Sequence, residues 1–208
     1  MYKLILPLLC VISSPCFAQT TNLTDTALLQ PVEISAVKAL DKAPTAKTNM
    51  AKKEIALWNT GRDLPFLFNQ TPSVTINSDA GNGIGYSNMR IRGSDASRIN
   101  VTLNGIPFND AESQGTFFVD MPDIASSASQ IQIQRGVGTS ANGTGAFGGS
   151  ININTNEPVL EKGLELNNAA GSYHSFKNTL ILHSGLFKKY FTADLRLSHI
   201  KSDGYIER

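Results

Sequence analysis

The sequence has few cysteines, few charges and no long apolar segment beyond its first residues. Only two of the 208 residues are cysteine, Cys10 and Cys16. The chain after residue 18 therefore has neither disulfides nor thiol chemistry. Charged residues make up 17% of the chain, below the roughly 25% of ordinary soluble domains. No later segment approaches the roughly 20 apolar residues of a membrane-spanning helix, which excludes a helical membrane protein.

Neither sign of charge is in excess. The formal net charge is +1, and without Lys3 the chain has 17 basic and 17 acidic residues. Proteins that bind nucleic acid need a basic surface to displace counterions from phosphate. The composition therefore argues against a nucleic-acid partner.

Enzyme motifs are also missing. Residues 143–148 match the dinucleotide pattern GxGxxG, but a strand pattern follows where that motif requires a helix. His174, His183 and His199 are widely spaced and indicate no metal site. The sequence gives no support to an enzyme, to a cofactor or to a bound metal.

Residues 1–18 have the features of a secretory signal peptide. Lys3 supplies the positive start, residues 4–12 are apolar, and Cys16-Phe17-Ala18 precedes an expected cleavage site. We therefore expect the chain to be exported across an inner membrane.

Residues 31–37 form a short β-prone segment between two polar segments, 19–30 and 38–53. Its apolar side chains alternate at Val32, Ile34 and Ala36. An isolated strand of this length has no core of its own, so it could pair with the edge of a sheet on another protein. It could equally be an edge strand of the domain that follows, and the local pattern does not distinguish the two.

The region 43–157 is predicted to consist of short strands joined by tight turns. Twelve of the 17 glycines lie between residues 81 and 149. Asn104-Gly105 predicts a hairpin turn, and strict alternation predicts strands at 131–135 and 150–154. Gly148 and Gly149 precede the latter strand, where a side chain would meet neighbouring backbone.

Two short helices are also expected in this region. One covers residues 63–68, with Asp63 as its cap and Pro65 in its first turn. The other covers residues 122–128.

Longer amphipathic strands are predicted beyond Pro158. They run from Leu164 to Gly171, from Ser175 to Phe187 and from Tyr190 to Ile200. A meander of strands with one apolar and one polar face is typical of an outer-membrane barrel. A soluble sandwich gives the same alternation, but the signal peptide favours the barrel.

The ordered set of motifs resembles the plug domain of TonB-dependent outer-membrane receptors, which take up iron–siderophore complexes, cobalamin and similar scarce nutrients. Besides residues 31–37, the segments that carry the resemblance are Leu64-Pro65, Thr71-Pro72-Ser73-Val74, Ile91-Arg92-Gly93, 103–107, 131–136 and 145–153.

The resemblance implies an α+β plug with a small mixed sheet of four strands and short helices, followed by the first antiparallel strands of an incomplete β-barrel. The implied parts are a signal peptide (1–18), a flexible arm (19–42), the plug (43–157) and the barrel start (158–208). About three strands are present where the family's barrel needs about 22, so we expect an N-terminal piece of a larger receptor.

The resemblance also implies partners and a location. The implied partners are the periplasmic energy transducer TonB, outer-membrane lipid around the barrel, and an iron–siderophore or similar ligand. The implied location is the outer membrane of a Gram-negative bacterium, with the plug accessible from the periplasm. A free-standing periplasmic binding or adaptor domain, with residues 160–208 as a soluble appendage, is the alternative.

Three sets of site residues follow from the resemblance. TonB would bind the box Pro31, Val32, Glu33, Ile34, Ser35, Ala36 and Val37. Arg92 and Arg135 would contact glutamates on the barrel wall. The ligand would face loops at 79–85, 95–98 and 109–118, with the candidate residues Asp79, Asn82, Ser97, Arg98, Phe117 and Phe118. For Phe117 and Phe118, packing inside the plug is an equally good interpretation.

Overall fold

The computed structural model describes residues 38–205 except 41, 139–141, 143–144 and 189, and these residues belong to one compact unit. The expected signal peptide and the box at 31–37 lie outside the described residues. None of the described helices combines the length and the apolar character needed to cross a membrane.

The strands are β1 Lys47–Ala51, β2 Val74–Ser78, β3 Ser87–Ile91, β4 Ile99–Leu103, β5 Ile106–Pro107, β6 Gln130–Arg135, β7 Gly149–Asn154, β8 Lys162–Gly171, β9 Ser175–Ser184 and β10 Asp194–Lys201. The helical elements are α1 Lys52–Trp58 and the 3₁₀ turns η1 Leu64–Phe68, η2 Ala96–Arg98, η3 Phe118–Asp120 and η4 Ile124–Ser126.

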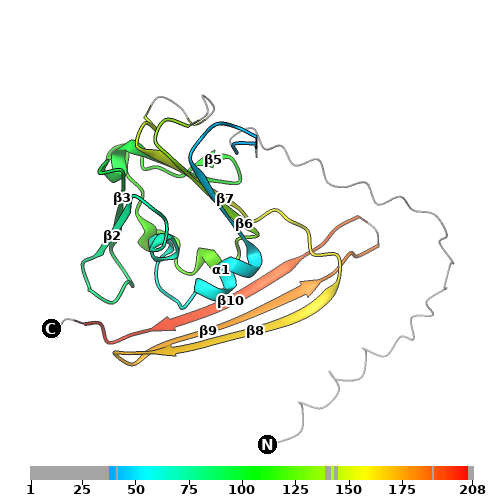
Figure 1. Ribbon diagram of the computed structural model, residues 1–208. Coiled ribbons are helices and arrows are strands. Elements are labelled where there is room, and N and C mark those ends of the chain that lie inside the picture. The colour runs from blue at the N-terminus through cyan, green and yellow to red at the C-terminus, as the bar shows by residue number, and fades with distance from the viewer. Residues whose placement is uncertain (1–37, 41, 139–141, 143–144, 189, 206–208) are drawn as a thin grey trace, which may run out of the picture. The chain divides into compact units, whose positions relative to one another are not determined.

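Five strands form a mixed sheet in the order β1-β6-β7-β4-β5 (Figure 1). Strands β4 and β7 pair in parallel, and the other neighbours pair antiparallel. The expected strands 131–135 and 150–154 are confirmed as β6 and β7. The Asn104-Gly105 turn joins β4 to the two-residue β5, and both turn residues have positive φ, as this turn type requires. The sheet thus has four longer strands, as the resemblance implied, and one short edge strand.

The two faces of the mixed sheet differ in chemistry. One face carries isoleucines such as Ile131 and Ile151, which are fully buried in the hydrophobic core. On the other face Asn49, Gln132, Asn152 and Thr102 are aligned in one row across β1, β6, β7 and β4. We call this second face, which also includes Gln134 and Ser150, the amide face. Of the residues named here, all except Asn49 are buried.

Two adjacent glycines allow strand β7 to pack closely. A Cβ added to Gly149 would lie 2.7 Å from the Gln134 carbonyl oxygen, and one added to Gly148 would lie 2.8 Å from the Arg98 carbonyl oxygen. Neither glycine is among the residues with positive φ. The expected approach of neighbouring backbone is confirmed, and the requirement for glycine is one of space.

The two short helices expected from the sequence are both 3₁₀ turns. Residues 64–68 form η1, and Asp63 makes no side-chain capping bond. Asp63 instead accepts a hydrogen bond of 2.6 Å from the Ser87 hydroxyl, which connects η1 to β3. Within 122–128 only Ile124–Ser126 is helical, as η4. Tertiary hydrogen bonds replace the local cap in the first case, so the sequence pattern alone was misleading.

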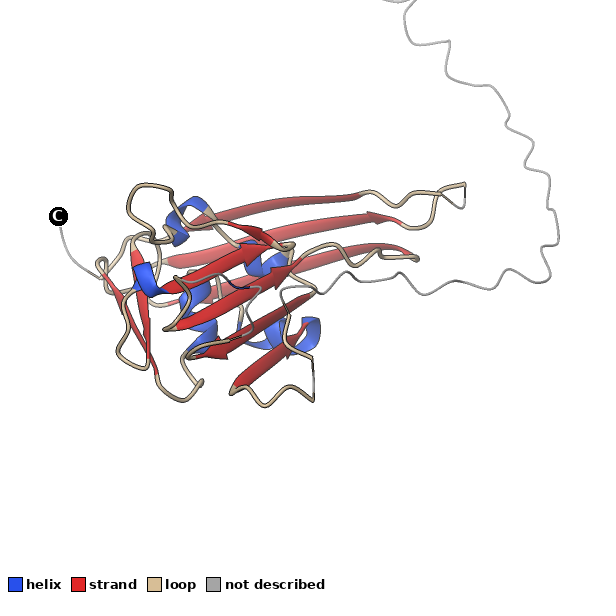
Figure 2. Ribbon diagram, turned by 90° about the horizontal axis from the view of Figure 1, so that it is seen from above, coloured by secondary structure: helices blue, strands red, loops and turns tan. Residues whose placement is uncertain are grey.

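The last three strands form a separate antiparallel sheet in the order β10-β9-β8, which is open at both edges. In Figure 2 these strands extend beyond the mixed sheet. β9 ends at Ser184 and β10 begins at Asp194, so both are shorter than expected. The reason is the turn between them, in which Gly185 has φ 63° and Phe187 bridges to Phe191.

The faces of this three-stranded sheet alternate as the sequence predicts. Lys177, Thr179 and Ile181 on β9 are buried on the face that meets the rest of the domain. The register places six leucines on the opposite face in two rows across the sheet: Leu164, Leu182 and Leu195, then Leu166, Leu180 and Leu197. Five of the six are exposed. Helix α1 lies between the mixed sheet and the three-stranded sheet (Figure 1).

Candidate functional site

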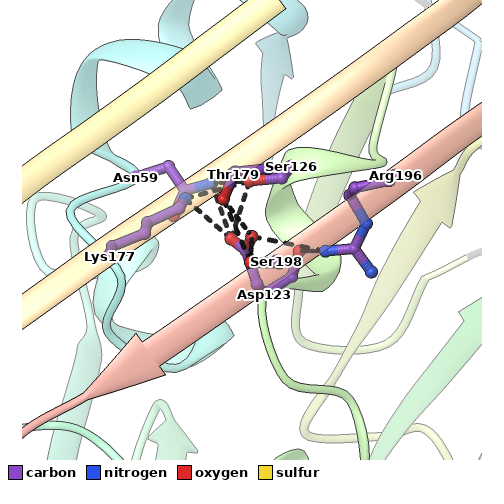
Figure 3. A network of polar contacts seen from close by, with 7 residues as sticks. All are labelled: Asn59, Asp123, Ser126, Lys177, Thr179, Arg196 and Ser198. Atoms are coloured by element: carbon purple, nitrogen blue, oxygen red, sulfur yellow. Dashed lines mark hydrogen bonds and ion pairs between the residues drawn. The ribbon is translucent and has the colours of Figure 1, made fainter.

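A buried carboxylate connects the segment before β6 to the three-stranded sheet (Figure 3). The Asp123 side chain is 1% exposed, and Asp123 precedes η4 with φ 51°. Its Oδ1 lies 2.7 Å from Nζ of Lys177 on β9, and its Oδ2 lies 3.3 Å from Nη1 of Arg196 on β10. The Lys177 side chain is 4% exposed, so this is an ion pair removed from water.

Hydroxyl groups complete the contacts of the Asp123 carboxylate. Ser198 and Thr179 donate to Oδ2 over 2.5 and 3.0 Å. Ser126 donates to Oδ1 over 2.7 Å, and the Asn59 amide reaches the same oxygen at 3.3 Å. We call Asp123, Lys177, Arg196, Thr179, Ser198, Ser126 and Asn59 the ionic cluster.

The electrostatics of the ionic cluster keep Asp123 charged. Burial opposes ionisation of Asp123, but hydrogen bonds from Lys177, Ser198 and Ser126, with the Lys177 charge, hold its pKa below the usual value. A buried ion pair of this kind is costly to break, because the remaining partner is left uncompensated. The cluster is therefore suited to hold the mixed-sheet domain against the three strands.

A second ion pair crosses the same boundary at the surface. Lys52 Nζ lies 3.2 Å from Glu165 Oε1, with side chains 47% and 41% exposed. A cavity of about 360 Å³ separates α1 from β8 nearby, and its lining includes the polar side chains of Asn59 and Asn168. Exposed pairs of this type contribute little to stability. The buried cluster is thus the stronger of the two contacts.

No sequence pattern predicted the ionic cluster. Alternation predicted a polar face on the strand that carries Arg196 and Ser198, but it gave no role to Asp123. The available signal was the presence of cationic side chains, Lys177 and Arg196, on a strand face that becomes buried. Such charges require an acidic partner.

Arg92 and Arg135, predicted to contact a barrel wall, lie beside each other. The Arg92 guanidinium covers Gly136, and the Arg135 guanidinium donates to the Pro72 carbonyl oxygen at 3.3 Å. Neither arginine forms an ion pair with any residue that the structure describes. The Nε of Arg135 is buried and has no hydrogen-bond partner among those residues. Their pairing with a wall stays a prediction.

The predicted ligand-facing residues are not gathered in one place. Asp79 and Asn82 lie in the loop between β2 and β3, whereas Ser97 and Arg98 lie in η2 beyond the opposite end of β3. The Ser97 hydroxyl donates to Asp95 over 2.6 Å, and the Arg98 guanidinium lies 5.2 Å from the Phe147 ring centre. The two pairs are therefore separated by the length of β3.

The predicted aromatic pair is also divided. Phe118 is 3% exposed and belongs to the hydrophobic core, which is the packing role considered for it. Phe117 is 46% exposed and remains accessible. Phe118 is therefore closed to a ligand in this structure.

The loop that carries Asp79 and Asn82 contacts the residues that follow β10. Asn82 Nδ2 donates to Ser202 Oγ over 2.8 Å, and the Tyr205 ring packs on Gly81. Tyr205 also stands edge-on to Tyr173, at 5.4 Å between ring centres. The hairpin of β2 and β3, which forms a two-stranded sheet of its own, thus contacts the residues that follow the three-stranded sheet.

Solved structures that are similar to this chain include receptors and a transporter. The chain is similar to FpvA of P. aeruginosa in complex with pyoverdine and iron, with 16% identity, a TM-score of 0.58 and coverage of 77% of this chain and 21% of that one. It is similar to the ferric yersiniabactin uptake receptor FyuA of Yersinia pestis, with 15% identity, a TM-score of 0.57 and coverage of 74% and 24%. It is also similar to the copper transporter OprC, with 20% identity, a TM-score of 0.57 and coverage of 81% and 26%.

The chain spans about a quarter of the length of these structures. At these identities the likeness shows the fold: a plug with a mixed sheet, followed by antiparallel strands like those that begin a TonB-dependent barrel. The model of the TonB-dependent Receptor Plug Domain family matches residues 39–150, more than half of the chain. The chain therefore belongs to the TonB-dependent receptor plug domain family.

Proposed function

We propose that this chain forms the plug and the first barrel strands of a TonB-dependent outer-membrane receptor that imports a scarce nutrient. The observation that carries this proposal is the ionic cluster, which holds a domain of the plug family on three amphipathic strands. A transporter needs a plug that is firmly seated on its wall, whereas the part of the chain that the structure describes shows no set of residues suited to catalysis. We therefore propose transport and no enzymatic activity.

The exposed leucine face supports a membrane location. Leu164, Leu166, Leu195 and Leu197 are each more than half exposed, on the face turned away from the plug. A contiguous apolar face of this kind is unfavourable in water and suits the lipid-facing side of a barrel. The proposed location is the outer membrane of a Gram-negative bacterium, rather than the periplasm as a free-standing domain.

We propose an iron–siderophore complex, or a cobalamin-like ligand, as the cargo. The similarity to FpvA and FyuA supports this class, while the similarity to OprC extends the range to copper. The loop 79–85 is the proposed contact, because Asp79 is exposed and Asn82 is partly exposed there.

TonB is the proposed partner, and the box at 31–37 is its proposed binding segment. Strand addition depends on backbone hydrogen bonds, so removal of one backbone donor should weaken it. Ile34→Pro removes that donor, whereas Ile34→Val keeps the donor and the β-branched side chain.

The test is titration of the purified TonB periplasmic domain against the full chain in detergent. We expect binding by the wild type and by Ile34→Val, and at least tenfold weaker binding by Ile34→Pro. Equal affinity of all three forms would remove the box assignment, and recovery of the native product as a soluble periplasmic protein would favour the free-standing domain.

A further inference from the structure

The side-chain amide of Gln132, on the amide face, holds the segment that directly follows the box. The Ala39 N–H donates to Gln132 Oε1 over 2.8 Å, and Gln132 Nε2 donates back to the Ala39 carbonyl oxygen over 3.1 Å. A side chain thus pairs with Ala39 in the way that a strand backbone would. Both residues are buried, Ala39 completely and Gln132 to within 1%.

The remaining hydrogen-bonding capacity of Gln132 is also used. Its Nε2 donates to Asn49 Oδ1 over 2.7 Å, and its Oε1 accepts from Gln134 Nε2 over 2.9 Å. A primary amide has two donors and two acceptor lone pairs, so all four are occupied. Leucine or methionine would satisfy none of them, and glutamate would lack both donors.

The position of Gln132 in the fold lets its side chain hold one loop of the chain at both ends. Asn49 is on β1, so Gln132 joins both ends of the loop that leads from Ala39 into the edge strand. Beside it, Lys38 Nζ donates to Gln130 Oε1 over 2.6 Å, and Lys47 Nζ donates to the Leu40 carbonyl oxygen. Ala39 is only two residues beyond the end of the box at Val37.

We propose that Gln132 is the positioning residue that holds the arm on the plug, so that tension applied at residues 31–37 reaches the Gln132–Ala39 contact before any strand pair. This inference rests on the proposed function. The contact consists of neutral hydrogen bonds, each worth little net free energy because water replaces them on opening. The Gln132–Ala39 contact can therefore open while the mixed sheet stays intact, because its strand pairs extend over more residues than this contact.

Opening would expose a hydrophilic surface. Ala39 lies over Gln132, a buried polar side chain of the amide face. Release of the arm would hydrate this face at little cost, since amides and hydroxyls bond to water as well as to each other. An apolar face in the same place would oppose release.

The test compares three variants of the full chain by hydrogen exchange and mass spectrometry. Gln132→Met keeps an unbranched side chain of similar length and removes every hydrogen bond to Ala39. Ala39→Pro removes the N–H from the arm side and leaves the sheet unaltered. Thr102→Val is the matched control, since it removes another buried hydrogen bond of the amide face, at 2.6 Å to Asn152 Oδ1, away from the arm.

We expect amides of residues 40–46 to exchange about tenfold faster in Gln132→Met, which loses both hydrogen bonds to Ala39, and to exchange faster by a smaller factor in Ala39→Pro, which loses one. The amides of β6 and β7 should keep their protection, and Thr102→Val should leave the arm unchanged. A purely structural role of Gln132 would instead reduce protection of arm and sheet by the same factor. Unchanged arm exchange in both variants would overturn the proposal.

The outcomes separate this inference from the proposed function. Exchange of the arm is measured without TonB, so loss of arm protection establishes the Gln132 contact even if TonB fails to bind. Conversely, TonB binding that depends on Ile34, together with unchanged arm exchange, would support the receptor and reject the role of Gln132.

Discussion

Two contacts of the plug use opposite chemistry. At the arm, Gln132 holds Ala39 through neutral amide hydrogen bonds. At η4, Asp123 holds β9 and β10 through a buried ion pair with Lys177 and through two hydroxyl donors on the strands, Thr179 and Ser198. Neutral hydrogen bonds contribute about 0.5–1.5 kcal/mol each, whereas breaking one side of a buried ion pair costs about 3–5 kcal/mol. The comparison indicates a plug that is held firmly on the three strands and lightly at its arm.

The largest expected effect comes from removal of the Asp123 charge. Asp123→Asn leaves Lys177 buried without a counter-charge and should lower the free energy of unfolding by about 3–5 kcal/mol. The measurement is urea unfolding of the full chain, followed by fluorescence of Trp58, the single tryptophan, next to Asn59 in the ionic cluster. The matched control is Lys52→Gln at the exposed pair with Glu165, which should cost less than about 1 kcal/mol. An equal loss of unfolding free energy in the two variants would contradict the conclusion that the ionic cluster is the stronger contact.

Acid should act on the same contact. Because the Asp123 pKa is lower in the folded chain than the roughly 3.9 of an unfolded aspartate, its contribution is present at neutral pH. That contribution is lost as the pH falls through the lowered value. In Asp123→Asn, the free energy of unfolding should therefore fall less steeply at acid pH than in the wild type.

A smaller effect is expected at the start of β7, in the sheet that connects the two contacts. Gly149→Ala places a Cβ against the Gln134 carbonyl oxygen and should cost about 1–3 kcal/mol through forced displacement of the backbone. Gly145→Ala, where no atom lies within 4 Å, should change stability by less than about 0.5 kcal/mol. Thermal melts of both variants measure the difference, and equal melting temperatures would show that β7 tolerates a side chain.

Local patterns in the sequence predicted most of the strands. Alternating isoleucines at 131–135 and 150–154 identified β6 and β7, and Asn104-Gly105 identified the hairpin, because period and turn chemistry are local properties. The cap expected at Asp63 failed because Ser87, 24 residues away, competes for its carboxylate. Local propensity carries no information on such a partner.

For the same reason, neither of the two contacts could be predicted from the sequence. Asp123 and Lys177 are 54 positions apart, and Ala39 and Gln132 are 93 apart. The alternation of 131–135 predicted that Gln132 and Gln134 share a face, but it could not show that the arm covers that face. Only the fold brings these residues together.

The most direct test of the difference between the two contacts is a single-molecule pulling measurement. The chain after Cys16 has no cysteine, so Thr24→Cys and Asn168→Cys, with Cys10 and Cys16 replaced by serine, give unique attachment points. We expect a first step at low force with roughly 3 nm of extension as about nine arm residues are released. A second step at higher force should follow as the plug leaves the strands. Gln132→Met should remove only the first step, and Asp123→Asn should lower the force of only the second step. A single step in the wild type, or loss of the first step in Asp123→Asn, would contradict the proposed difference between the two contacts.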